Sequence, residues 1–463
     1  MISLKKRSAH EVDMTEGSIV RHLLNFAMPL FVGNLFQMLY NMVDTWVVGN
    51  FVSDAAFSAV GTLGSVTNLM IGFFTGLSSG AGVVVSQFFG SKRNEKVKET
   101  VGTSVVMTLI LCIAFTALGL LLIPVFMNIL DMPADVMDEA VTYLTIWFSG
   151  ISTLMIYNMG AGIMRAVGDS RRPFYYLVVS ALVNTVLDLL FVLVFDLGVA
   201  GVAAATVIAQ GFSALLVVIA MTRGESVVKV DARTLRLNLP ILKSILKVGL
   251  PAAIQVSITS FSNIFVQSYI NYFGKECMGG WTAYGKIDQI VLLPMQSLAI
   301  ASTTFVGQNL GVDNVKRAEK GANVAFYLSL IFTLLLIVPI ICFSRFFVSI
   351  FNSNPLIIEY GTLFLRWLTP FYLVWCVNQI YAGALRGSGN STVPMIIMLG
   401  SFVAFRQVYL FIVSNYISNE ILPIAMGFPA GWVLAASITF LYYKRIGLSS
   451  SKLLKEVTAN KEL

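Results

Sequence analysis

Long apolar runs follow one another along the whole chain and are separated by short polar segments. A run of about 20 apolar residues is long enough to cross the hydrocarbon core of a bilayer as a helix. The short alternating segments of a membrane β-barrel do not occur. The pattern therefore predicts an all-α integral membrane protein with twelve transmembrane helices, at residues 21–48, 55–88, 99–125, 136–158, 173–195, 199–221, 245–272, 281–308, 318–344, 356–384, 393–414 and 422–443.

Composition and charge placement agree with this interpretation. Hydrophobic residues make up 57% of the 463 positions and charged residues only 12%, whereas a soluble protein carries about 25% charged residues. The net charge of +7 comes from Lys and Arg in short segments between the apolar runs, such as "SKRNEKVK", "RAVGDSRR" and "VKRAEK". This placement is typical of topology signals and not of nucleic-acid binding. We expect a bacterial-type cell (inner) membrane protein, multi-pass, with both termini in the cytoplasm.

The two halves of the chain resemble each other. The segment "AGIMRAVGDSRRP" (161–173) recurs in the second half as "AGALRGSGNSTVP" (382–394). Six spans separate the copies, so the halves are parallel repeats related by an axis along the membrane normal. We predict an N-terminal cytoplasmic segment, an N-lobe of six helices, a cytoplasmic linker, a C-lobe of six helices and a cytoplasmic tail, at residues 1–20, 21–222, 223–242, 243–446 and 447–463.

A polar stripe interrupts the first expected helix. In "QMLYNMVDTW" (37–46), four polar residues stand at i, i+3, i+4 and i+7 and share one helix face: Gln37, Tyr40, Asn41 and Asp44. Two later helices of the N-lobe carry similar faces, formed by Ser180, Asn184 and Asp188 and by Thr206 and Gln210. Polar faces in a bilayer turn toward each other and away from lipid, so we expect them to line one cavity in the N-lobe.

The two aspartates suggest a chemistry for this cavity. Asp44 and Asp188 both fall late in helices that run outward, and two carboxylates that meet in a low-dielectric site cannot both stay ionised. A proton or a bound cation relieves the repulsion, and the oxygen ligands present suit a hard cation such as sodium. The corresponding C-lobe positions hold Val266 and Tyr409, which favours a role confined to one lobe. The alternative is that these polar groups only hold helices together.

Other residues narrow the range of functions. Four cysteines show no paired spacing, and both histidines lie near the N-terminus, which removes the usual ligands for haem or zinc. No phosphate-binding loop or hydrolase motif occurs, so we expect neither an enzyme nor a cofactor. Arg165 and Arg386, in the repeated turn, are interpreted as topology and helix-end residues. Four further ionisable residues within spans receive no role from the sequence: Lys286, Asp288, Arg366 and Arg406.

Several of these stretches resemble a known transporter family. "AMPLFVGNLFQMLYNMVDTWVVG", "NTVLDLLF" followed by "GVAGVAAAT", and the pair "VSQFFG" and "VGQNLG" are similar to motifs of the multidrug and toxic compound extrusion (MATE) transporters, in their DinF-like branch. The resemblance covers about residues 18–445. It implies a fold of two six-helix lobes, and export of cationic or amphipathic small molecules in exchange for protons or sodium.

The resemblance also implies roles for individual residues. It assigns proton or Na⁺ coupling to Asp44, Asn184, Asp188 and Thr206, and it matches Gln37, Tyr40 and Asn41 to residues that line the cavity of the N-lobe. Further candidates for this cavity and for substrate contact are Asn158, Ser180 and Gln210. Pro29, inside the first helix, is expected to act as a hinge. The expected partners are small-molecule substrates and the lipid bilayer, with no nucleic acid, and the expected state is a monomer. The alternatives are a lipid-linked precursor flippase of the same superfamily and a non-transporting membrane scaffold or receptor.

Overall fold

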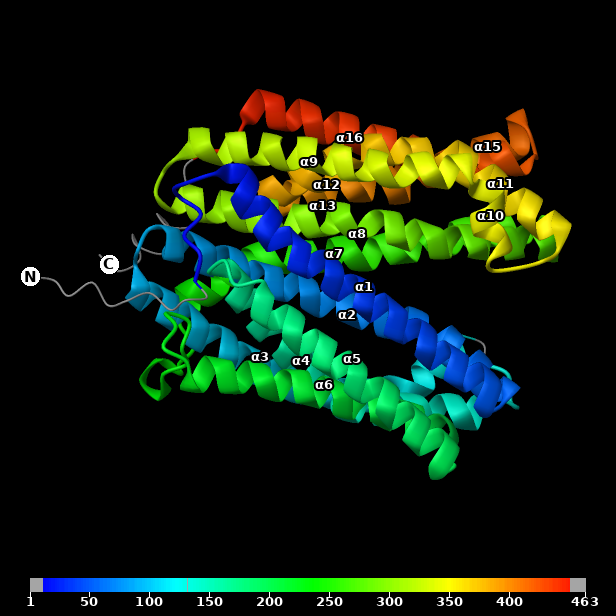
Figure 1. The fold of residues 1–463 in the computed structure, drawn as a ribbon, viewed down its shortest axis with the longest axis horizontal. Coiled ribbons are helices and arrows are strands. Elements are labelled where there is room, and N and C mark those ends of the chain that lie inside the picture. The colour runs from blue at the N-terminus through cyan, green and yellow to red at the C-terminus, as the bar shows by residue number, and fades with distance from the viewer. Residues whose placement is uncertain (1–10, 131, 450–463) are drawn as a thin grey trace, which may run out of the picture. The chain divides into compact units, whose positions relative to one another are not determined.

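The first half of the chain folds into long helices. The computed structural model describes residues 11–130 and 132–449. The N-terminal half contains α1 (Ile19–Phe51), α2 (Asp54–Gly90), α3 (Asn94–Ile129), α4 (Met137–Ala166), α5 (Arg171–Leu189), a π-helical turn η1 (Leu190–Val194) and α6 (Gly198–Arg223) (Figure 1). A short 3-10 turn, η2 (Ala232–Thr234), follows in the linker. The six expected helices of this half are confirmed.

The second half repeats the pattern with more interruptions. Its helices are α7 (Leu239–Asn271), α8 (Lys275–Gly311), α9 (Val315–Cys342), α10 (Ser344–Ser349), α11 (Pro355–Leu368), α12 (Tyr372–Gly387), α13 (Thr392–Met398), α14 (Arg406–Ile412), α15 (Ile421–Ala425) and α16 (Gly427–Ile446). A 3-10 turn, η3 (Thr369–Phe371), joins α11 to α12, and π-helical turns η4 (Leu399–Phe405) and η5 (Val413–Ile417) flank α14.

The helices fit a multi-pass membrane protein. Within the described residues, eleven are long and apolar enough to cross a membrane. The span expected at 356–384 is not among them as one helix, because α11 and α12 are separated by the turn that contains Pro370, where proline cannot continue a regular helix. The sequence did not predict α10 and η2. The all-α membrane class is confirmed, and the predicted tail beyond residue 449 and the first ten residues lie outside the described residues.

The repeated turn has the same backbone in both halves. Gly168 and Gly389 have φ angles of 88° and 91°, in the left-handed region that favours glycine. Each donates its N–H to the carbonyl of the repeated arginine, Arg165 at 2.9 Å and Arg386 at 2.8 Å. The glycine is thus needed to end α4 and α12 in the same way, which explains why the motif is present in both copies.

The described chain divides into two units, each with its own internal contacts. The first unit contains Pro29–Ala253, together with residues 11–13; the second contains Met14–Met28 and the chain from Ile254 onward. The division therefore falls inside α1, at Pro29, and inside α7, two residues after Pro251. The sequence had placed the boundary in the linker at 223–242 instead. The first unit thus includes the first part of α7, and the second unit includes the first part of α1.

The beginning of α7 is held firmly within the first unit. A Cβ atom at Gly80 of α2 would lie 2.5 Å from the Cα atom of Gly249, and one at Gly76 would lie 2.3 Å from the backbone nitrogen of Ala253. Only glycine permits backbones to approach so closely. These contacts explain why residues 239–253 pack with α2 although the chain continues into the second unit.

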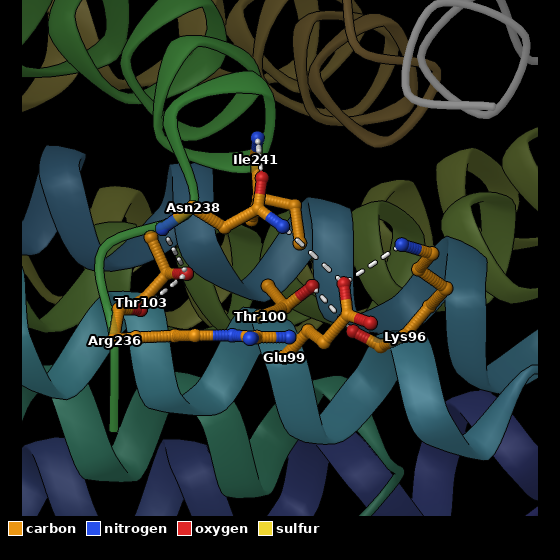
Figure 2. Close-up of polar contacts among 7 residues, drawn as sticks. All are labelled: Lys96, Glu99, Thr100, Thr103, Arg236, Asn238 and Ile241. Atoms are coloured by element: carbon orange, nitrogen blue, oxygen red, sulfur yellow. Dashed lines mark hydrogen bonds and ion pairs between the residues drawn. The ribbon is translucent and has the colours of Figure 1, made fainter. Parts of the chain in front are cut away.

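The linker that precedes α7 is fastened to α3, as Figure 2 shows. The backbone N–H of Asn238 donates to the hydroxyl of Thr103 (3.2 Å), and the Asn238 amide donates to Glu99 (3.3 Å). Glu99 also pairs with Lys96 at 2.7 Å. The side-chain oxygen Oδ1 of Asn238 accepts from the backbone N–H of Ile241 (3.3 Å) and so satisfies a donor at the first turn of α7.

The segment before α1 is held in an equivalent way within the second unit. The N–H of Met14 donates to the side chain of Gln308 at 2.9 Å, and the carbonyl of Met14 accepts from Asn309 and Arg317. Arg317 also donates to the carbonyls of Glu16 and Gly17, both at 2.9 Å. The entry to α1 is therefore attached to the end of α8 and the start of α9.

Candidate functional site

A close contact between α1 and α5 sets the level of the two aspartates in the first unit. A Cβ atom at Gly33 would lie 3.1 Å from the ring of Phe174 and 3.5 Å from Leu177, so α1 lies directly on α5 there. Asp44 follows Gly33 along α1 at the same sequence separation as Asp188 follows Leu177 along α5. Over that separation each helix makes about three turns and rises about 16 Å, which brings the aspartates to the same level.

The two carboxyl groups meet at this level. Asp44 and Asp188 lie within hydrogen-bonding reach of each other. Asp188 is fully buried, and both of its carboxyl oxygens, like Oδ1 of Asp44, have no donor among the described residues. A contact between two carboxyl groups is attractive only when one carries a proton or a cation lies with them. This arrangement is chemically able to hold one proton or one cation, and its coupling role stays a prediction.

An unpaired amide completes this part of the cavity. Asn184 lies one turn before Asp188 on α5 and is 2% exposed, and neither its oxygen nor its nitrogen has a hydrogen-bond partner in the described structure. Buried polar side chains are nearly always paired. Asn184 thus joins Asp44 and Asp188 as a third side chain in this part of the first unit with unpaired buried atoms.

The remaining polar residues of α5 and α6 have partners within the helices. The Thr206 hydroxyl donates to the carbonyl of Val202 on its own helix (3.1 Å). Ser180 donates to the carbonyl of Ala209 (2.7 Å) and so joins α5 to α6. Gln210 is half-buried on α6. None of these contacts connects α6 to the carboxyl pair, so the coupling role of Thr206 stays a prediction.

The stripe on α1 continues from the carboxyl pair along the helix. Tyr40 lies one turn before Asp44 and interacts with it and with Gln37, whereas Asn41 is exposed. On α4, Asn158 donates to the carbonyl of Leu154 (2.9 Å) and accepts from Thr75 of α2 (3.5 Å). Asn158 is thus tied to α2, and its substrate-lining role stays a prediction.

One residue near the pair was not predicted from the sequence. Tyr143 of α4 interacts with both Asp44 and Asp188. It lies near the start of α4, and Asp44 lies near the end of α1. Successive helices alternate in direction, so these two ends lie on the same side of the first unit. Tyr143 could have been predicted from this shared position, but only if the ends of α1 and α4 had been known.

Two irregular backbone features lie on the helices that carry the aspartates. The π-helical turn η1 begins just after Asp188, and such turns often occur at functional positions because they shift the register of a helix. Pro29 lies inside α1 at the division between the two units, about four helical turns before Asp44. Proline interrupts the backbone hydrogen bonds of a helix, and the hinge role of Pro29 stays a prediction.

The second unit has a different interior at the corresponding positions. Val266 is fully buried in an apolar cluster, and the Tyr409 hydroxyl donates to the carbonyl of Pro423 (3.0 Å). Its carboxyl group in α8, Asp288, accepts from Tyr372, whose hydroxyl also lies 2.8 Å from that of Tyr284. This carboxyl group therefore has a donor within the protein, unlike the carboxyl group of Asp188 in the first unit.

The family model described as MatE matches residues 29–190 and again residues 251–412. The chain belongs to the MatE family. The two matches begin at Pro29 and Pro251, which confirms the internal repeat in a transporter family and places its start inside α1 and α7. The resemblance to the MATE transporters drawn from the sequence motifs is confirmed as well.

Relatives of full length support the same assignment. The chain is 28% identical over 444 residues to the probable multidrug resistance protein YpnP of Bacillus subtilis (strain 168), covering 96% of this chain and 99% of that protein. It is 26% identical to the probable multidrug resistance protein NorM of Thermotoga maritima, covering 92% of each. A solved outward-facing multidrug resistance MATE family transporter shares the fold, with a TM-score of 0.90 and 23% identity over 97% of this chain and 100% of that one.

Proposed function

We propose that this MATE family transporter is a secondary antiporter that exports cationic or amphipathic small molecules in exchange for protons or Na⁺. The observation that carries the proposal is the pair of carboxyl groups of Asp44 and Asp188: both oxygens of Asp188 and Oδ1 of Asp44 are buried and have no donor within the described residues. The relatives of similar length are named as probable multidrug resistance proteins, which supports a role in drug export. The bias of Lys and Arg toward alternate segments supports a cell-membrane location with cytoplasmic termini.

The carboxyl pair suits either coupling ion. A proton shared by Asp44 and Asp188 would turn their repulsion into a hydrogen bond. A sodium ion would find three oxygen-bearing side chains, since the carbonyl of Asn184 is buried and unpaired beside them. The chemistry of the donor set therefore fits both ions, and each neutralises the same two charges.

The change in charge is linked to the shape of α1. When the pair is neutralised, α1 beyond Pro29 can pack closely against α5, and the cavity of the first unit becomes smaller. When the pair is empty and charged, repulsion and hydration hold the cavity open for a cationic substrate. Entry of the ion then displaces the substrate. Antiport results because ion and substrate compete for the same cavity in the first unit.

The gradient of the coupling ion supplies the free energy for this exchange. If the exported compound has no net charge, one ion that enters across about 100 mV provides about 2.3 kcal/mol, which corresponds to about a fifty-fold concentration ratio at about 1.4 kcal/mol per factor of ten. If one singly charged cation leaves for each ion that enters, no net charge crosses the membrane, and the concentration gradient of the ion alone drives export.

Efflux from proteoliposomes tests the proposal when a proton gradient and a sodium gradient are imposed separately. Asp188→Asn preserves the shape of the side chain but removes its charge, and we expect it to reduce gradient-driven efflux to the level of empty liposomes. The matched control is Asp196→Asn, at an exposed position with a φ of 52° that Asn also tolerates. Normal efflux by the Asp188 variant, or no flux by the unmodified protein under either gradient, would disprove the proposal.

A further inference from the structure

The second unit buries a cation for which the described chain offers no anion. Arg406 begins α14 and is 1% exposed, which makes it the largest of the fully buried side chains. The ion pairs found within the described residues join Lys96 to Glu99, Lys98 to Glu95 and Arg172 to Asp169, and none involves Arg406. A buried charge without a counter-charge is costly in a membrane protein and marks a functional position.

Aromatic rings and amide groups hold the guanidinium in place. Its central carbon lies 4.3 Å from the ring centroid of Phe402 and 4.4 Å from that of Phe428. One terminal nitrogen donates to the side-chain oxygen of Asn263 at 3.0 Å, and it lies 3.5 Å from the hydroxyl of Ser262. These contacts fix the plane of the guanidinium, yet all of its partners are neutral.

Part of the hydrogen-bonding capacity of Arg406 is unused. Its Nε atom is buried and has no partner in the described structure. Cation–π contacts compensate only part of the cost of removing a guanidinium from water. A guanidinium with free donors in a fixed plane is suited to a carboxylate or phosphate, which accepts two parallel hydrogen bonds.

The guanidinium lies next to a polar patch at the surface of the second unit. Asn263, which contacts the guanidinium directly, is exposed, and Gln407, half-buried, donates to the hydroxyl of Ser262 (3.4 Å). Asn263 and Gln407 are neutral and can move their amide groups away from the guanidinium without leaving a charge unpaired. An oxyanion can therefore approach Arg406 by displacing the side chain of Asn263.

We propose that Arg406 recognises a carboxylate group on a transported amphipathic compound. This inference rests on the proposed export function, and it assigns one substrate-recognising residue to the second unit. Arg406 then contributes a specificity-determining positive charge within that unit. Neutral aromatic walls at Phe402 and Phe428 keep the guanidinium free of any internal counter-charge, so the bound carboxylate supplies it.

Binding of two matched dyes to the purified full-length protein tests this assignment. The probes are a rhodamine with a free benzoate carboxylate and its methyl ester, which differ only in the anionic group. We expect the unmodified protein to bind the free acid more tightly than the ester. Arg406→Gln should reduce the ratio of the two affinities about tenfold, because hydrogen bonds to a charged partner are lost.

Arg366→Gln is the matched control in the same unit. Its Nε donates to Ser344 at 3.0 Å, away from the patch around Asn263, so the affinity ratio should stay unchanged. Asn263→Asp provides a second variant that retains Arg406. An aspartate there supplies an internal counter-charge, so it should lower the affinity for the free acid and leave binding of the ester intact.

The outcomes separate this inference from the export function itself. Equal affinity of the unmodified protein for acid and ester, or an unchanged ratio in both Arg406→Gln and Asn263→Asp, would overturn the role of Arg406. Binding of the ester reports whether each variant is folded. The measurement needs no ion gradient, so the ratio should also persist in Asp188→Asn, even though efflux by that variant is lost.

Discussion

The interiors of the two units differ although the units share a turn, a helix order and a family model. In the first unit, the carboxyl groups of Asp44 and Asp188 meet, and both oxygens of Asp188 and Oδ1 of Asp44 are buried without a donor among the described residues. In the second, the equivalent positions hold Val266, which is fully buried, and Tyr409, which is paired with a backbone carbonyl. The buried charge there is a guanidinium, that of Arg406.

This difference shows which parts of the repeat the fold requires. The glycine turns after α4 and α12 are the same because a left-handed residue is needed to end both helices. The carboxyl groups are not the same, so the helix packing does not require them. A group that the architecture can omit in one copy, and that remains unpaired in the other, is explained better by ion exchange than by structure.

The largest expected effect comes from introducing a carboxyl group into the second unit. Val266→Asp copies the residue of the first unit into an apolar cluster in which Val266 is 0% exposed. We expect a loss of about 3–5 kcal/mol in the free energy of unfolding, because the new carboxylate would be buried without a partner. Thermal unfolding in detergent measures this loss. Val266→Leu serves as the apolar control, and similar stabilities of the two variants would contradict the proposed contrast between the interiors.

A smaller effect on stability is expected from removing the hydrogen-bond donor to Asp288 in the second unit. Tyr372→Phe deprives Asp288 of its hydrogen bond and should lower the free energy of unfolding by about 2 kcal/mol. Gradient-driven efflux per folded molecule should persist, because this carboxyl group is structural. Tyr409→Phe, which loses a bond to a neutral carbonyl, is the milder control. Loss of ion coupling in the Tyr372 variant would show that Asp288 takes part in exchange.

Competition between ion and substrate predicts that substrate affinity falls as the concentration of the coupling ion rises. Lowering the pH protonates the carboxyl pair and removes the negative charge that attracts a cationic substrate. If the coupling ion is a proton, substrate affinity should fall, by up to about tenfold per pH unit. If it is Na⁺, affinity should fall as Na⁺ is raised. Asp44→Asn should remove this dependence, and equilibrium binding of a cationic dye measures it. A substrate affinity that changes with neither pH nor Na⁺ concentration would refute competition between ion and substrate.

The smallest effects distinguish the neutral residues of the site. Asn184→Ala removes an unpaired buried amide beside Asp188 and should weaken ion-coupled efflux several-fold, less than Asp188→Asn does. Thr206→Val should weaken it less than Asn184→Ala, since no contact joins Thr206 to the carboxyl pair and its hydroxyl, which donates to Val202, offers only the lone pairs of one neutral oxygen. The ion dependence of initial efflux rates measures both variants. A stronger effect of Thr206→Val than of Asn184→Ala would reverse the ranking and place the ion nearer to α6.

Local patterns in the sequence were sufficient for the architecture and for part of the site. Apolar runs, glycine turns and charge placement depend on short segments, and they predicted the membrane class, the repeat and nearly all of the long helices. The spacing of Asn184 and Asp188 placed both on one face of α5, because an α-helix repeats about every 3.6 residues. The tenth expected span was predicted as one helix because hydropathy does not register the turn at Pro370.

Only the tertiary structure decided which polar groups meet. The approach of α1 to α5 at Gly33 brings Asp44 to Asp188, whereas Thr206 bonds to its own helix. The assignment of the first parts of α1 and α7 to different units depends on contacts between segments far apart in the chain, such as the glycine contacts between α2 and α7. The sequence also left Arg406 without a role. Phe402 precedes it by one helical turn, but Phe428 and Asn263 belong to α16 and α7 and are brought to it only by folding. Contacts of this kind depend on the packing of whole helices, which no local periodicity encodes.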